Sequence, residues 1–257
     1  MKSLPAPGIE DPVSLSAINE THIAFLDRGG DRLVVFAGEE LTVLAEGLDG
    51  VRCAARASAL VVLDRSGGLP SFELSRGALG ALDVRAGANA IVFGRGGSLI
   101  VGFGEDARRE HGDLIERIGA SPASASPEGV DGATALAAES GGVWVGGARP
   151  EPRMVLLRPS PAGYDERMRF HLPAPPIAAE IGPDGALYVL LEPGDKVLRF
   201  FAEGDQAVHD LADPPLRDLA RAGNRLLGCG PSGLFDLTDL AAEPKHTAPP
   251  ELPPCDG

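Results

Sequence analysis

The sequence has few cysteines and no long apolar run. Its three cysteines, Cys53, Cys229 and Cys255, are odd in number and show no Cys-x-x-Cys spacing, so neither a disulfide framework nor a zinc knuckle is indicated. No window approaches the roughly eighteen apolar residues of a membrane span. Residues 1–12 lack the apolar stretch of a signal peptide. We therefore expect a cytoplasmic protein that does not insert into a membrane.

Lysine is also scarce, and positive charge is not clustered. The chain carries 37 acidic against 23 basic residues, a net charge of -14 and a pI near 4.7. Only Lys2, Lys196 and Lys245 are lysines, and the excess of arginine together with abundant alanine is typical of a high-GC bacterial genome. Because nucleic-acid binding depends on clustered Lys and Arg, we do not expect a nucleic-acid partner for this acidic protein.

Glycine and proline, by contrast, are abundant. The chain has 34 Gly and 23 Pro among 257 residues. Gly and Pro in a helix interior cost about 1 and about 3 kcal/mol respectively, so a bundle of long helices is nearly excluded. Disorder is disfavoured because 44% of the residues are hydrophobic and the mean hydropathy is +0.03. The composition therefore predicts a compact protein built from many short elements and turns.

An internal repeat organises these short elements. Apolar runs rich in β-branched or aromatic residues recur about every forty residues, and each follows a Gly, Asn or Asp turn. The six runs are HIAFLD from His22, ALVVLD from Ala59, SLIVGF from Ser98, GVWVGG from Gly142, ALYVLL from Ala186 and RLLGCG from Arg225.

Each run has similar neighbours, which indicates a blade of four strands. A strand of small residues precedes it, as in VRCAAR from Val51, and a tight turn such as Gly96-Gly97 joins the two. A third apolar run follows, and in most repeats a fourth, more polar run is visible. Four antiparallel strands per forty residues are typical of a β-propeller. We predict an all-β fold with a single β-propeller of six four-stranded blades, with five or seven as alternatives.

The repeat also sets the expected boundaries. We assign residues 13–243 to the propeller, 1–12 to an N-terminal extension that can help to close the ring, and 244–257 to a Pro-rich tail. The third repeat lacks a clear fourth strand and continues into a small-polar loop over Gly119 to Gly129. Its charged segment, Glu105 to Arg117, is interrupted by His111-Gly112 and is interpreted as a hairpin loop.

The fifth repeat, IGPDGALYVLLEPGDKVLRFF from Ile181 to Phe201, resembles a known repeat. A PDG turn at Pro183 to Gly185 precedes one strand, and a GD turn at Gly194-Asp195 precedes a strand that ends in Arg-Phe. The pattern is similar to that of NHL-type propellers and their gluconolactonase/regucalcin-like, strictosidine-synthase-like and streptogramin-lyase-like relatives. The resemblance covers the architecture of most of the chain and the motif of about one blade.

The resemblance implies where chemistry would lie. Enzymes of this superfamily place their sites at one mouth of the central channel. Lactonase-like members bind Ca²⁺, Mn²⁺ or Zn²⁺ there through Glu, Asn and Asp oxygens, and Glu20, Asn89 and Asp184 are the candidate equivalents in three blades. Asp184 is equally explained by its turn. A lyase-like histidine base paired with a glutamate would be His171 or His209.

No catalytic set stands out, so our first hypothesis is a non-catalytic module. We expect a scaffold or structural component that binds protein partners without a cofactor, within a larger assembly. Trp144 and Tyr188, at the same place in consecutive repeats, are either packed between blades or exposed for a partner. The alternative is a divalent-metal-dependent lactonase or hydrolase acting on a small molecule at the channel mouth.

Overall fold

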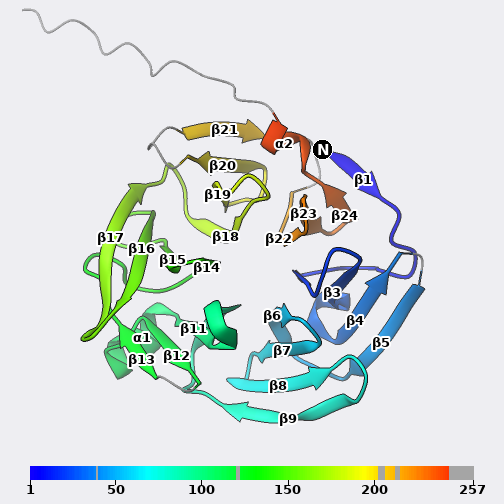
Figure 1. Cartoon of the computed structure of the whole chain (residues 1–257), viewed down its shortest axis with the longest axis horizontal. Helices are drawn as coiled ribbons and strands as arrows, with labels where there is room; N and C mark the ends of the chain where they lie inside the picture. The colour runs from blue at the N-terminus through cyan, green and yellow to red at the C-terminus, as the bar shows by residue number, and fades with distance from the viewer. Residues whose placement is uncertain (39, 120–121, 202–205, 212–214, 243–257) are drawn as a thin grey trace, which may run out of the picture.

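The computed structural model of the protein is a ring of six four-stranded antiparallel sheets around a central channel (Figure 1). It describes residues 1–38, 40–119, 122–201, 206–211 and 215–242. In the first five blades the four strands follow one another in the chain, and the first strand is innermost. The predicted six-bladed β-propeller is therefore confirmed. No helix within the described residues is long and apolar enough to cross a membrane.

The strands of the blades, from the innermost outward, have the following bounds. Blades 1 to 3 consist of β2 (Ser14–Ala17), β3 (His22–Asp27), β4 (Arg32–Ala37) and β5 (Glu40–Glu46); β6 (Gly50–Arg56), β7 (Ala59–Asp64), β8 (Gly68–Glu73) and β9 (Gly77–Asp83); and β10 (Ala88–Phe93), β11 (Leu99–Phe103), β12 (Ile115–Ile118) and β13 (Ala123–Ala125). Blades 4 to 6 consist of β14 (Ala135–Glu139), β15 (Gly142–Gly147), β16 (Arg153–Ser160) and β17 (Gly163–His171); β18 (Pro176–Ile181), β19 (Leu187–Leu191), β20 (Lys196–Phe200) and β21 (Gln206–Asp210); and β22 (Asp218–Ala222), β23 (Arg225–Gly230), β24 (Gly233–Asp236) and β1 (Lys2–Leu4). The helices are α1 (Glu105–His111) and α2 (Asp239–Ala242).

The two ends of the propeller meet in blade 6. Strand β1 pairs antiparallel with β24, with Ser3 opposite Phe235, so the N-terminal segment supplies the outermost strand of the last blade (Figure 1). This pairing satisfies the backbone edge of β24 and joins the first blade to the last. The Pro-rich tail, 244–257, lies outside the described residues.

Blade 3 differs from the sequence interpretation in two places. It has a fourth strand, β13, in which Ala125 lies opposite Ile115. The segment expected as a charged hairpin loop begins with the helix α1, so that expectation is wrong. Gly112, which we interpreted as an interruption, ends the helix with φ 83° and donates its N–H to the Arg108 carbonyl. Glycine at that position is a common helix terminator.

The core is divided into six apolar clusters, one between each pair of adjacent blades. The second strand of each blade is buried on both faces, which explains why it appears as a continuous apolar run rather than an alternating one. In β19, Leu187 and Val189 pack toward blade 4, whereas Tyr188 and Leu190 pack toward blade 6. The six apolar runs of the repeat are therefore the second strands of the blades, and their side chains fill the clusters between neighbouring blades.

Close approach between blades depends on glycine at Gly194, in the turn between β19 and β20. Its φ is 103°, and a Cβ atom there would lie 2.1 Å from the Leu216 carbonyl oxygen. Leu216 donates its N–H to the Gly194 carbonyl at 2.8 Å. Any side chain at this position would separate blade 5 from the start of the inner strand of blade 6.

The inner strands are connected by side chains, because each presents an unpaired backbone edge to the channel. Ser14 Oγ accepts the Cys53 N–H at 3.1 Å, and Ser16 Oγ accepts the Ala55 N–H at 2.9 Å. We call Ser14, Ser16, Thr134, Glu180 and Asp218 the inner-strand polar residues, since each hydrogen bonds to the inner strand of an adjacent blade.

Glu180 makes its connection at an electrostatic cost. Its carboxylate accepts the Arg221 N–H at 3.3 Å and the Ile181 N–H at 2.8 Å. Burial raises the pKa of this carboxyl from 4.5 to about 7, because removal from water disfavours the charged form. Asp218 raises it further, whereas the two N–H donors and Arg221 oppose the shift.

We predict that Glu180→Gln reduces the pH dependence of stability. Between pH 4.5 and about 7 the folded protein retains a proton that the unfolded chain releases, so the free energy of unfolding of the wild type falls as the pH rises through this window. Urea denaturation at a series of pH values measures the slope. Glu40→Gln, on an exposed outer strand, is the matched control. Equal slopes in wild type and Glu180→Gln would contradict the raised pKa.

Candidate functional site

The central channel collects the polar side chains of the inner strands. It encloses about 180 Å³ and is lined by all six inner strands. Most of its wall consists of small or aliphatic residues such as Ala17, Ala55 and Ala138. Four charged residues interrupt this wall, and they are Arg52, Glu180, Asp218 and Arg221.

Arg52 extends across the channel. It belongs to β6 in blade 2, and its Nη2 donates to the Ile177 carbonyl of β18 in blade 5 at 2.8 Å. These blades face each other across a ring of six (Figure 1). Nη1 makes longer contacts with the carbonyl oxygens of Val13 and Val51, at 3.5 and 3.4 Å. A fixed positive charge therefore lies where the inner strands begin.

Asp218 lies in the same part of the channel and is buried. Its Oδ2 accepts the Ser14 hydroxyl at 2.6 Å and the Leu15 N–H at 3.1 Å, while Oδ1 accepts the Leu219 N–H at 2.9 Å. Burial raises the pKa of this carboxyl above its usual value of 3.8. The positive charge of Arg52 and the hydrogen bond from Ser14 oppose the shift. Asp218 is therefore a buried carboxyl of raised pKa whose charge interacts with that of Arg52, and shifted pKa values of this kind are a feature of functional sites.

The neighbouring cysteine is not an activated nucleophile. Burial raises the pKa of the Cys53 thiol to about 12, and the negative charge of Asp218 contributes to the shift. The thiolate is the reactive form of cysteine. Cys53 therefore acts here as a small packing residue, as does Cys229, which is also buried and free.

Two adjoining hollows open at the mouth where the inner strands begin. The larger measures about 400 Å³ and is lined by Arg52, Arg65 and Asn89 among others. The second measures about 250 Å³, shares Asn89 and Thr134 with the first, and is bordered by Glu105 and Arg149. Together they have the size of a small-molecule site, for which roughly 300–1,000 Å³ is typical.

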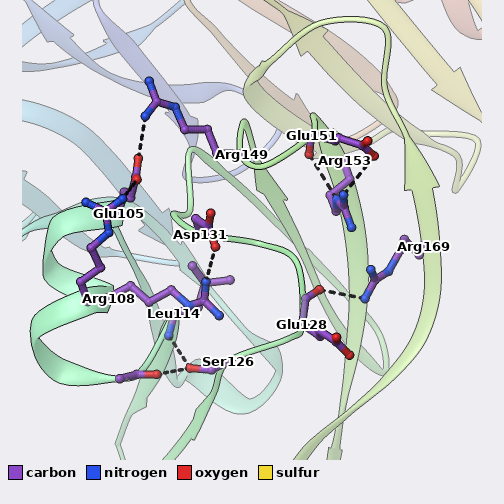
Figure 2. A network of polar contacts seen from close by, with 12 residues as sticks. Glu105, Arg108, Leu114, Ser126, Glu128, Asp131, Arg149, Glu151, Arg153 and Arg169 are labelled. Atoms are coloured by element: carbon purple, nitrogen blue, oxygen red, sulfur yellow. Dashed lines mark hydrogen bonds and ion pairs between the residues drawn. The ribbon is translucent and has the colours of Figure 1, made fainter.

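Hydrogen bonds hold the rim of this mouth. Arg149 Nη1 donates to Glu105 Oε2 at 3.3 Å, as Figure 2 shows, and both residues line the second hollow. Arg108 of α1 pairs with Asp131 at 2.9 Å. Ser126, from the small-polar segment after β13, accepts the Leu114 N–H at 3.1 Å. The segment from Glu105 to Arg117 and the described part of Gly119 to Gly129 therefore pack against the propeller.

The residues expected to bind a metal do not come together. Asn89 is at the start of β10, near the mouth with the two hollows. Glu20 lies in the turn between β2 and β3, and Asp184 in the turn before β19, so both are at the opposite end of the inner strands. Asp184 accepts the Tyr188 hydroxyl at 3.0 Å and pairs with Arg199.

The channel also does not offer the donor set of a divalent metal. Within the described residues, no three His, Cys, Asp or Glu side chains form a group that could hold an ion. The guanidinium of Arg52 instead brings positive charge to the mouth. Hard cations require several oxygen ligands, so the residues present do not fit the metal that the family resemblance implies.

The other candidates lie away from the channel. His171 and His209 belong to β17 and β21, the outermost strands of their blades, and His171 Nδ1 is 3.6 Å from Glu151 Oε2. Trp144 and Tyr188 are buried between blades and present no open surface to a partner. Trp144 stacks on Phe170 with ring centroids 5.4 Å apart.

Sequence reasoning missed the charged residues of the channel. Arg52, Glu180 and Asp218 each lie in a strand of small residues, within VRCAAR, IAAEIG and LRDLAR. A charged residue within a strand of small residues was the sequence signal that could have identified these channel residues. A side chain of this kind must reach the channel or a partner, because the neighbouring blades leave no other polar environment for it.

Comparisons with solved structures show the fold. A gluconolactonase from Xanthomonas campestris superimposes with a TM-score of 0.72 at 15% identity, covering 89% of this chain and 86% of that one. Virginiamycin B lyase from Staphylococcus aureus gives 0.62 at 13%, covering 86% and 78%. A chain of the mitotic checkpoint complex gives 0.64 at 12%, covering 91% and 89%.

Comparison by sequence adds no closer relative. No protein-family model matches the chain, and no curated protein matches it. The structural likenesses nevertheless agree with the resemblance of the fifth repeat. These likenesses show that the protein shares its overall fold with a gluconolactonase and with streptogramin B lyase.

Proposed function

We propose that the protein is a hydrolase of a small lactone or ester, with its site at the channel mouth where the inner strands begin. The observation that carries the proposal is the combination of Arg52 and Asp218 in one channel, which shares the lining residues Arg52, Thr134 and Ile177 with the hollow of about 400 Å³. Arg52 offers a positive charge at the hollow itself, and Asp218 offers a proton acceptor in the adjoining channel.

The hollow suits a small, uncharged, hydroxyl-bearing substrate. One arginine of each hollow is paired with a carboxylate, since Arg65 of the larger hollow pairs with Asp49 at 3.1 Å and Arg149 of the second with Glu105 at 3.3 Å. Asn89 contributes an exposed amide with no side-chain hydrogen bond to the described residues. Balanced charges and free N–H groups favour hydroxyl and carbonyl oxygens over a strongly charged ligand.

The chemistry assigned to the site is the addition of water to a carbonyl carbon. Asp218 takes a proton from the attacking water, and the guanidinium of Arg52 stabilises the negative charge that develops on the carbonyl oxygen. The ring C–O bond then breaks, and the proton held by Asp218 passes to the leaving oxygen. The product is a hydroxy acid.

The structural likenesses favour this reading over the non-catalytic module that we expected first. The neighbours include a gluconolactonase and a lyase, and Trp144 and Tyr188, the residues suggested for partner binding, are buried. The proposed mechanism differs from that of the divalent-metal-dependent lactonase or hydrolase that the sequence analysis gave as the alternative. Arg52 takes the electrostatic role of a metal ion, so the proposed hydrolysis needs no cofactor.

We predict that Asp218→Asn lowers kcat for lactone hydrolysis by about 10² to 10⁴-fold, the range expected for loss of a general base. The amide retains the shape of the side chain but cannot accept a proton from water. The measurement is proton release from a panel of five- and six-membered lactones at fixed pH.

The control is Asp236→Asn. Asp236 belongs to β24, the third strand of the same blade, and its carboxylate pairs with Arg225 at 3.1 Å. It does not line the channel. Thermal melts of both variants separate a loss of chemistry from a loss of folding. If no lactone is hydrolysed by the wild type, or if Asp218→Asn and wild type have equal rates, the proposal is wrong.

We also predict that prolonged dialysis against EDTA leaves the hydrolytic rate unchanged. The positive charge at the mouth comes from Arg52, which a chelator does not remove. Elemental analysis before and after dialysis accompanies the rate measurement. A stoichiometric divalent ion whose removal abolishes hydrolysis, and whose return restores it, would reinstate the metal-dependent alternative.

A further inference from the structure

Two arginines lie side by side on the outer half of blade 4, away from the channel. Arg153 begins β16, and Arg169 belongs to the neighbouring strand β17. Arg169 lies opposite Val155, two residues beyond Arg153, so the two arginine side chains leave the same face of the sheet. Figure 2 shows both side chains near the segment that carries Glu128.

Each guanidinium is held along one edge only. Arg153 donates from Nε to the Glu151 carbonyl at 3.1 Å and from Nη2 to its carboxylate at 3.3 Å. Arg169 donates from Nε and Nη2 to the Glu166 carboxylate at 2.9 and 2.6 Å, and from Nη2 to the Glu128 carbonyl at 2.9 Å. Within the described residues, Nη1 of neither arginine has a hydrogen-bond partner.

The two Nη1 groups converge beside Gly129. A Cβ atom on this residue would lie 2.7 Å from Nη1 of Arg153 and 3.5 Å from Nη1 of Arg169. The φ of Gly129 is 70°, a conformation that favours glycine. Glycine at this position therefore allows both guanidinium groups to approach one point on the loop.

The carboxylates of Glu151 and Glu166 neutralise the two guanidinium groups only in part. The Arg153 side chain is only 8% exposed, whereas that of its partner Glu151 is 67% exposed, and pairs with a solvated member are weak. Glu151 and Glu166 occupy the outer edges of the guanidinium groups, which fixes their orientation. Neither Nη1 has a hydrogen-bond partner among the described residues, and we call the space between the two Nη1 groups beside Gly129 the gap. The charge of Glu128 also acts on Arg169.

We propose that this gap binds a tetrahedral oxyanion, as inorganic phosphate or as a phosphate monoester. One phosphate oxygen would accept from Nη1 of Arg153 and another from Nη1 of Arg169, forming charge-assisted hydrogen bonds to both. The site is separate from the channel and does not depend on the proposed hydrolysis. It gives the outer rim of blade 4 a binding role for phosphorylated molecules.

Isothermal titration calorimetry with inorganic phosphate and with phosphoserine tests the site. We expect one saturable site per chain and at least a ten-fold weaker affinity in Arg169→Gln. Arg167→Gln is the matched control, because Arg167 is in the same strand and pairs with Asp165 at 3.2 Å but takes no part in the gap. Phosphoserine binding as tight as inorganic phosphate indicates a monoester ligand, and tighter phosphate binding indicates the free ion.

A second variant, Gly129→Ala, tests the phosphate site without changing the charge of the protein. Gly129→Ala places a methyl group against Nη1 of Arg153 and is expected to weaken phosphate binding at least ten-fold without removing an arginine. Melting curves in phosphate-free buffer establish that both variants are folded. The proposal is overturned by the absence of saturable binding at millimolar phosphate, by an equal loss in Arg167→Gln, or by acetate binding as tightly as phosphate.

Discussion

The unpaired backbone edge of the inner strands is the constraint on which the rest of the structure depends. Six inner strands surround the channel, and in the described part of the chain each of them pairs with one strand only, the second of its blade. A buried N–H or C=O without a partner costs about 1–3 kcal/mol. The hydroxyls of Ser14 and Ser16 and the carboxylates of Glu180 and Asp218 satisfy part of this edge from adjacent blades.

The same constraint concentrates chemistry in the channel. Side chains that can bond to a free backbone edge are polar, and the apolar clusters between the blades leave them no other place. Burial then raises the pKa values of Glu180 and Asp218. Arg52, fixed on the Ile177 carbonyl, adds the opposite charge. Ring stability and the proposed reactivity therefore involve the same residues, so activity and stability must be measured together in each variant.

The repeating architecture could be predicted from the sequence, but the site could not. The run at β19 is apolar throughout because both of its faces are buried, and that signal recurs in every blade. The sequence offered residues 1–12 as a segment that can help to close the ring, but the pairing of Lys2–Leu4 with β24 joins opposite ends of the chain, and no local pattern encodes it. Arg52 belongs to the channel only because β6 and β18 face each other, and Glu20 and Asp184 fail to meet Asn89 because they follow their inner strands rather than precede them.

Solution NMR of the backbone amides, during titration with a lactone or its hydroxy-acid product, tests the central claim most directly. We expect the largest shift changes at Arg52, Asn89, Thr134 and Ile177, around the mouth where the inner strands begin, and none in the outer strands. Changes centred on Glu180 and Arg221 at the opposite end of the channel, or on the perimeter of the ring, would contradict the location of the site.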